Sequence, residues 1–139
     1  GGTDPRRDDH PVCITDVHAT AVDVAGGEAS LSEHGRSLAP LLAGDPASWR
    51  DAVACQSEGI GHLLCTTRMI RRGPWKYVFN AGDLDELYHL DDDPNELTNL
   101  AVDPGHRATL RELREALADW MEANHESLLG QYRMIISQS

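Results

Sequence analysis

Between Cys13 and Ala25 the apolar positions recur every three or four residues, which is the spacing of one helix face. This spacing predicts a helix from Cys13 to Ala25, with either Thr15 or Asp16 as its N-terminal cap. The apolar positions of the predicted face are Ile14, Val17, Ala21, Val24 and Ala25. Residues 37–42 predict a second, shorter apolar turn or helix.

The middle of the chain changes to short apolar or alternating runs, which are typical of β strands. The runs with strand character are 52–55, 63–66, 67–71, 75–80 and 84–90. Glu58–His62 contains two glycines and is expected to form a loop between two strands. Because side chains alternate along a strand, Trp75, Tyr77 and Phe79 share one face, which we expect to be core.

The last third of the chain has helical periodicity. Asp93–Glu96 predicts one short capped turn, and Asp103-Pro104 predicts the start of an amphipathic helix that runs to Asn124. The apolar stripe of this helix consists of Leu110, Leu113, Leu117, Trp120 and Met121. Trp75, Tyr77, Leu117 and Trp120 are expected to share one core. Residues 128–139 predict either a docking strand or a frayed end.

These elements together predict an α+β fold, in which a small antiparallel sheet packs against a long C-terminal helix. The chain has 139 residues, with 23 acidic and 12 basic side chains and a formal net charge of −11. This charge argues against binding to nucleic acid or to an anionic membrane, since both attract clustered Lys and Arg. No apolar run reaches the length of a membrane span, and residues 1–11 contain no signal peptide, so the cytoplasm is slightly favoured as the compartment.

Few residues suggest chemistry by their spacing. The three cysteines form no C-x-x-C pair, which favours free thiols and leaves open one disulfide in an oxidising compartment. The seven histidines lack metal-ligand spacing, and the acidic run Asp91–Glu96 fails the pattern of a calcium-binding EF-hand loop. No nucleophile or phosphate-binding motif is present either, so we assign no catalytic residue and no metal ligand.

Glu58 and His62 are the candidates for a substrate-side role. Both lie in the expected glycine-containing loop, and loops between strands often carry functional side chains. Glu58 or His62 would serve there as a general base or as a substrate contact. The alternative is that this loop is only a mobile surface segment.

Four blocks of the chain resemble the sulfatase family, within the alkaline-phosphatase-like superfamily. Residues 16–26 resemble its D-x-x-P-T-x-x-D-x-A-G segment, with Ala19 in place of proline, and residues 35–44 resemble G-x-S-L-x-P-L-L-x-G. Residues 68–80 are similar to R-x-x-R-x-G-x-W/Y-K-Y, and residues 86–101 to E-L-Y-D-L-x-x-D-P-x-E-x-x-N-L. His89 stands where the family more often has Asp, and the resemblance extends over residues 13–124.

The resemblance implies that residues 1–48 are the incomplete C-terminal edge of a large α/β domain and that residues 49–139 are the small C-terminal subdomain. Sulfatases use formylglycine, made from a Cys or Ser in C/S-x-P/A-x-R, together with a calcium ion. None of Cys13, Cys55 and Cys65 fits that motif. The implied function is therefore a C-terminal sulfatase fragment that is inactive alone, with both cofactors in the full-length parent.

The expected partner is the N-terminal sulfatase domain of the same parent chain, with association of copies through the C-terminal tail as a further expectation. Two alternatives stay open. A phosphonate or phosphate ester hydrolase of the same superfamily would carry the same blocks, and a non-catalytic interaction module would need no upstream active site.

Overall fold

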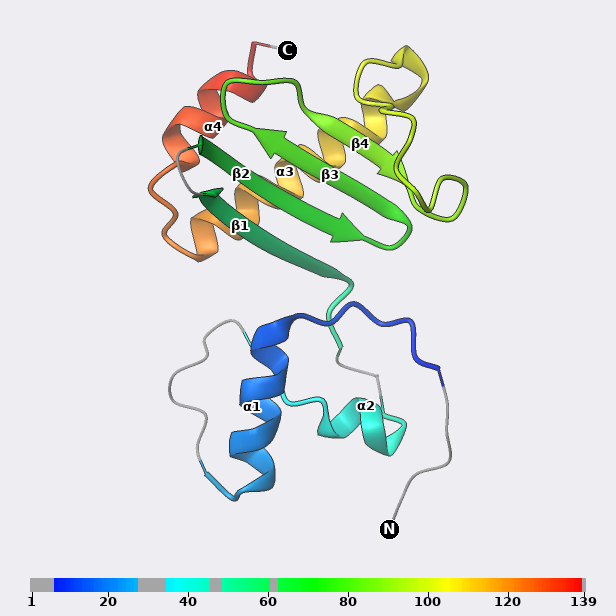
Figure 1. Ribbon diagram of the computed structural model, residues 1–139, viewed down its shortest axis with the longest axis vertical. Helices are drawn as coiled ribbons and strands as arrows, with labels where there is room; N and C mark the ends of the chain where they lie inside the picture. The colour runs from blue at the N-terminus through cyan, green and yellow to red at the C-terminus, as the bar shows by residue number, and fades with distance from the viewer. Residues whose placement is uncertain (1–6, 28–34, 46–48, 61–62, 139) are drawn as a thin grey trace. The chain divides into compact units, whose positions relative to one another are not determined.

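The computed structural model describes residues 7–27, 35–45, 49–60 and 63–138. The chain divides into two compact units, Gly1–Val53 and Ala54–Ser139 (Figure 1). In the described part of the chain, no helix combines the length and the hydropathy that crossing a bilayer requires.

The described residues of the first unit form the helices α1 (Ile14–Val24) and α2 (Ala39–Ala43). The predicted cap of α1 is wrong in its position, because the N-terminal cap is Cys13. Asp16 contributes from inside the first turn, where its Oδ2 accepts a 2.8 Å hydrogen bond from the Cys13 N–H. This arrangement satisfies a backbone donor that the start of the helix would otherwise leave unpaired. After α2, Gly44 has a φ of 85°, a conformation that glycine adopts without a steric cost.

The apolar face predicted for α1 is exposed in this unit. Ile14, Val17 and Val24 are 83%, 55% and 78% exposed. The buried side of the helix instead carries Asp16 and Ala19. The helix therefore buries the carboxylate of Asp16, while much of its apolar stripe is exposed to solvent.

The second unit is built on a sheet with the strand order β1-β2-β3-β4. The strands are β1 (Ala52–Ile60), β2 (Leu63–Arg72), β3 (Trp75–Asn80) and β4 (Glu86–His89). The β2–β3 and β3–β4 pairs are antiparallel. The runs 63–66 and 67–71 form one strand, because no glycine or proline interrupts them. The predicted loop at 58–62 is wrong in its start, because β1 continues through Glu58 and Gly59 to Ile60.

A long helix, α3 (Arg107–Ala123), crosses one face of this sheet behind β2 and β3 (Figure 1). A single 3₁₀ turn, η1 (Pro104–His106), leads into it, and the Asp103 side chain caps that turn by accepting from the Gly105 N–H at 2.8 Å. The predicted α+β fold and the capped start of the helix are confirmed. The buried apolar residues of the second unit are Ile70, Tyr77, Phe79, Leu87, Tyr88, Leu110, Leu113, Leu117, Ala118, Met121 and Tyr132.

The predicted core is confirmed only in part. Tyr77 and Leu117 are completely buried, but Trp75 and Trp120 are half-buried. Trp75 is the first residue of β3, and its ring lies against His89 and His106. The two tryptophans therefore lie at the margin of the core.

The C-terminal tail is neither a strand nor a frayed end, so both predictions for it are wrong. It forms a helix, α4 (Leu129–Ile136), which packs against α3. Tyr132 of α4 is fully buried, and its ring meets Phe79 edge to face with centroids 4.8 Å apart. Its hydroxyl donates to the Arg114 carbonyl at 3.0 Å. Tyr132 therefore packs its ring in the core while its hydroxyl group keeps a hydrogen bond. These two contacts explain why the tail forms an ordered helix.

Candidate functional site

The structure describes one of the two substrate-side candidates, Glu58. Glu58 lies on strand β1, and 60% of its side chain is exposed. His62 lies outside the described residues, so its place relative to Glu58 stays a prediction. Glu58 is also engaged, because its Oε1 accepts a 2.5 Å hydrogen bond from the Arg68 guanidinium.

Arg68 is the buried centre of an ion-pair cluster in the second unit. Its side chain is only 3% exposed and is held by Glu58 and by Glu126, whose Oε2 lies 2.7 Å from the guanidinium. The Thr67 carbonyl accepts a further hydrogen bond at 2.9 Å. Burial works to lower the pKa of Arg68, but the hydrogen bonds and charges of Glu126 and Glu58 outweigh it and raise that pKa.

This cluster joins segments that are distant in the sequence. Glu58 is on β1, Arg68 is on β2, and Glu126 follows α3. Because the guanidinium already faces two carboxylates, it has no charge left uncompensated for an anionic substrate. The arrangement is that of a structural tie between the sheet and the end of the helix.

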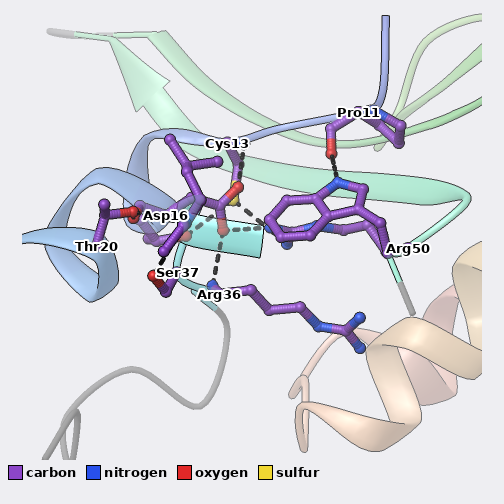
Figure 2. A network of polar contacts seen from close by, with 11 residues as sticks. Pro11, Cys13, Asp16, Thr20, Arg36, Ser37 and Arg50 are labelled. Carbon is purple, nitrogen blue, oxygen red and sulfur yellow. Dashed lines mark hydrogen bonds and ion pairs between the residues drawn. The ribbon is translucent and has the colours of Figure 1, made fainter. Parts of the chain in front are cut away.

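A second cluster surrounds Asp16 in the first unit. Figure 2 shows how Cys13, Arg36 and Arg50 converge on its carboxylate. The Asp16 side chain is fully buried and accepts 2.8 Å hydrogen bonds from the backbone N–H groups of Cys13 and Arg36. The Arg50 guanidinium completes the set with an ion pair to Oδ1. One carboxylate therefore links the start of α1 to the segments before α2 and before β1.

The Asp16 carboxylate is kept ionised by these donors. Burial works to raise its pKa, but the two backbone N–H groups and the Arg50 guanidinium outweigh burial and hold the pKa below its ordinary value. Because its pKa is lowered, the carboxylate is ionised near neutral pH and is a weak base there. Asp16 therefore fits a structural role rather than that of a general base.

The residues beside Arg50 add contacts of the same structural kind. The Trp49 indole donates to the Pro11 carbonyl at 2.8 Å, and the Arg50 guanidinium lies 5.0 Å from the centre of the Trp49 ring. The N-terminal segment is thus fixed to the chain just before β1.

A third polar cluster lies inside the second unit, around Asp85. Its Oδ2 accepts from the Tyr77 hydroxyl at 2.8 Å and from the Arg114 guanidinium at 2.7 Å. Burial first, and then the neighbouring Tyr132 and Asp85, raise the pKa of Tyr77. Tyr77 therefore stays protonated and acts as a hydrogen-bond donor, which suits a core residue rather than a nucleophile.

The formylglycine and calcium chemistry implied by the sequence does not fit the residues that are present. In residues 7–27, 35–45, 49–60 and 63–138, no group of three or more His, Cys, Asp or Glu side chains could hold a metal ion. None of the three cysteines lies in the C-x-P/A-x-R context that formylglycine formation requires. No catalytic step can be derived from these residues.

Sequence reasoning identified neither Arg68 nor Asp16 as the centre of a cluster. Arg68 sits in a strand run next to apolar residues, and its burial opposite Phe79 follows from the strand register. Asp16 was a candidate cap, but its partners Arg36 and Arg50 lie 20 and 34 residues away in the chain. Only the fold brings these groups together.

This fold, together with its sequence blocks, is that of the C-terminal region of the alkaline-phosphatase superfamily. A family model described as "N-sulphoglucosamine sulphohydrolase, C-terminal" matches residues 4–123. The chain belongs to this family, which is the C-terminal region of sulfatases.

Individual relatives agree with the family. An uncharacterized protein of Haemophilus influenzae is 31% identical over 132 residues, which cover 95% of this chain and 68% of that protein. The choline-sulfatase of Rhizobium meliloti is 37% identical over 123 residues, which cover 81% of this chain and 23% of that enzyme. The crystal structure of the phosphonate monoester hydrolase of Agrobacterium radiobacter matches with a TM-score of 0.67 and 31% identity, over 79% of this chain and 24% of that one. The chain thus spans about a quarter of the length of these two enzymes.

Proposed function

We propose that this chain is the C-terminal part of a sulfatase, a sulfuric ester hydrolase, and that it is inactive by itself. The observation that carries the proposal is the family match over residues 4–123, whose described part contains no group that could hold a metal ion. A sulfatase with its catalytic machinery outside these residues accounts for both facts.

In the complete enzyme, the nucleophile and the stabilisation of charge on the sulfate oxygens would be supplied by a formylglycine and a calcium ion, as the sequence resemblance implies. Both groups would be supplied by polypeptide outside the matched region. The described residues would contribute the small sheet, the long helix and the clusters around Arg68 and Asp16, which hold these elements in place.

A second function is favoured by one particular observation. The phosphonate monoester hydrolase of Agrobacterium radiobacter is 31% identical to this chain in the aligned region. A phosphonate or phosphate ester is therefore the alternative substrate class of the parent enzyme.

The partner that we propose for the first unit is the N-terminal sulfatase domain of the same parent. The support is the exposed apolar face of α1, on which Ile14, Val17 and Val24 are each more than half exposed. Burying such a face is favourable by about 25 cal/mol per Å² of apolar surface. The division into a large-domain edge at 1–48 and a subdomain at 49–139 belongs to the same proposal.

We expect the purified chain to hydrolyse neither an aryl sulfate nor a phosphonate monoester, with or without added calcium. The reason is the absence of a nucleophile motif from the sequence and of a metal-binding group from the described residues. The measurement is release of the phenol from an aryl sulfate or an aryl phosphonate monoester, compared with a blank without protein. Calcium-dependent turnover that a point substitution such as Glu58→Gln abolishes would contradict the proposal.

Sequencing the genomic DNA upstream of Gly1 separates the enzyme from the alternative of a non-catalytic interaction module. An in-frame C/S-x-P/A-x-R segment supports a sulfatase or a related ester hydrolase. An in-frame stop codon followed by a local start codon supports the interaction module.

The exposed face of α1 leads to a separate expectation for the isolated chain. The double substitution Ile14→Ser and Val24→Ser should change the free energy of unfolding by no more than about 0.5 kcal/mol, because both side chains are mostly exposed. It should also reduce self-association of the chain, measured by sedimentation velocity. His18→Ser, an exposed polar position on the same helix, is the matched control and should leave association unchanged.

Hydrogen exchange tests the same idea without a substitution. We expect weaker amide protection in residues 14–24 than in residues 107–123. Equal protection in a monomeric chain would show that α1 needs no partner domain.

A further inference from the structure

The C-terminal helix α4 turns back beside α3, so the two helices form an antiparallel pair (Figure 1). The Tyr132 hydroxyl reaches the Arg114 carbonyl, which lies 18 residues earlier in the chain, at 3.0 Å. Arg133, the next residue of α4, reaches the Glu122 carboxylate at 2.7 Å. Tyr132 is the buried residue of α4. The docked position of this helix therefore depends mainly on one aromatic side chain.

The connection between the two helices, residues 124–128, contains an unfavourable backbone conformation. His125 has a φ of 52°, in the left-handed region that residues with a Cβ rarely adopt. Its N–H donates to the Glu122 carbonyl at 3.1 Å, and the Glu126 N–H donates to the Met121 carbonyl at 2.9 Å. These two hydrogen bonds form a Schellman motif, in which glycine ordinarily takes the left-handed position. The chain thus reverses at a residue for which this conformation is costly.

One ion pair opposes the opening of this turn. Glu126 Oε2 lies 2.7 Å from the Arg68 guanidinium, and the Glu126 side chain is 12% exposed. If α3 continued as a helix through the connection, position 126 would be rotated by about 140° from the buried Met121. The Glu126 carboxylate would then point away from β2, and its pair with Arg68 would be lost. The strain at His125 therefore favours a straight helix, whereas the Glu126–Arg68 pair favours the closed turn.

The connection is able to continue α3, because residues 124–128 contain neither proline nor glycine. The straightened element would be one helix over 107–136, with a length of about 45 Å at 1.5 Å per residue. Its last two turns would leave their own unit, and Tyr132 would lose its contact with Phe79. The site that Tyr132 occupies in the closed form would then be open to another helix.

The straight helix of a second copy has the geometry to fill that site. Because α4 runs antiparallel to α3, a two-fold axis preserves the direction of this packing when the two helices come from different copies. The contacts Tyr132–Arg114 and Arg133–Glu122 are centred close to the connection itself. A two-fold axis near His125 would therefore restore both contacts between the two copies.

We propose that α4 exchanges between two copies of this chain, with residues 124–128 as the hinge. In the monomer α4 docks on its own α3, and in the dimer it docks on the α3 of the other copy. The dimer keeps the contacts of Tyr132 and relieves the strain at His125, but it loses the Glu126–Arg68 pair. A short strained hinge favours such an exchange. This inference goes beyond the proposed function and does not depend on it, because it involves only the second unit.

Two substitutions of the exposed His125 should change the association constant in opposite directions. His125→Gly relieves the strain of the closed turn and disfavours the straight helix, so it should lower the constant about tenfold for each of the two hinges. His125→Ala disfavours the left-handed turn and favours the helix, so it should raise the constant. His18→Ala, at an exposed histidine of α1, is the control and should leave it unchanged.

Sedimentation equilibrium measures these constants in the Ile14→Ser and Val24→Ser background, in which association through α1 is reduced. About 0.3 M salt screens the repulsion between copies that each carry a net charge of −11. In the same background, Glu126→Gln keeps a hydrogen-bond acceptor but removes the charge that faces Arg68 in the closed form. This variant should raise the association constant several-fold, because it weakens the closed turn and not the straight helix.

Isotope-filtered NMR on a mixture of ¹³C-labelled and unlabelled chains separates exchange from contact between surfaces. We expect an NOE between the Tyr132 ring of one copy and the Phe79 ring of the other, because these ring centroids lie 4.8 Å apart when α4 is docked. If Glu126→Gln does not fold, the two His125 variants and this NOE decide the matter. A chain that stays monomeric at millimolar concentration, equal association of His125→Gly and His125→Ala, or a dimer without the NOE between copies would overturn the exchange.

Discussion

Replacing Leu117 by alanine is expected to lower the free energy of unfolding of the second unit by about 2–5 kcal/mol. Leu117 is completely buried on the side of α3 that faces the sheet, among Tyr77, Met121 and other residues that are also fully buried. The substitution removes apolar contact and leaves a cavity that a close-packed core fills only partly. Because domains of this size are stable by only about 5–15 kcal/mol, the loss is a large fraction of the total.

Chemical denaturation followed by circular dichroism measures this change. The matched control is Leu97→Ala, which makes the same chemical change at a side chain that is 82% exposed. The control should stay close to wild type, since surface substitutions usually change stability by no more than about 0.5 kcal/mol. Equal losses from Leu117→Ala and Leu97→Ala would show that α3 does not form the core described above.

The second unit was largely predictable because its signals are local. The stripe of α3, from Leu110 to Met121, repeats over about three turns, and Asp103-Pro104 marks the start of the helical region with a cap and a helix-compatible proline. The alternation of Trp75, Tyr77 and Phe79 gave the correct inward face of β3. Both signals follow directly from the side-chain periods of helix and strand. These elements and their buried faces can therefore be predicted without knowledge of tertiary contacts.

The predictions for the C-terminal tail and for the start of the 58–62 loop were wrong because tertiary contacts, not the local sequence pattern, determine the secondary structure there. Residues 128–138 have no strong periodicity, and their helix is stabilised by Tyr132 packing on Phe79. Gly59 suggested a loop, but it is accommodated inside β1 with a φ of 103°. A glycine in a strand is unfavourable alone, and pairing with β2 outweighs this cost.

The candidate site was less predictable than the fold. The glycine-containing run 58–62 predicts a loop position for Glu58, whereas the structure places Glu58 on a strand, where its carboxylate accepts a hydrogen bond from Arg68. The clusters around Arg68 and Asp16 each join residues more than 30 positions apart. Which charged residues pair over long distances in the chain depends on the topology of the fold. The topology cannot be derived from the local pattern of a single sequence. The sequence blocks, in contrast, identified the sulfatase family without any knowledge of these contacts.

Replacing Asp16 by asparagine is expected to destabilise the first unit by about 3 kcal/mol. The substitution keeps the shape of the side chain but removes the anion that faces the Arg50 guanidinium, whose side chain is only 14% exposed. It also weakens the hydrogen bonds from the Cys13 and Arg36 N–H groups, because an ionised acceptor binds these donors more strongly than an amide. Loss of amide protection in residues 14–24 measures the effect, while residues 107–123 should keep theirs.

The pH dependence of the same unit provides an independent test. Because the pKa of Asp16 is lowered in the folded state, its contribution is fully present above the ordinary carboxyl pKa of about 4. The contribution is lost as the pH falls through the lower pKa of the folded state, so the wild-type unit should unfold in acid more steeply than Asp16→Asn. The matched control is Asp9→Asn, which removes an exposed pair with Arg7 in the same unit and should keep the steep acid transition. If Asp9→Asn and Asp16→Asn flatten the transition equally, the buried carboxylate is not what holds this unit together.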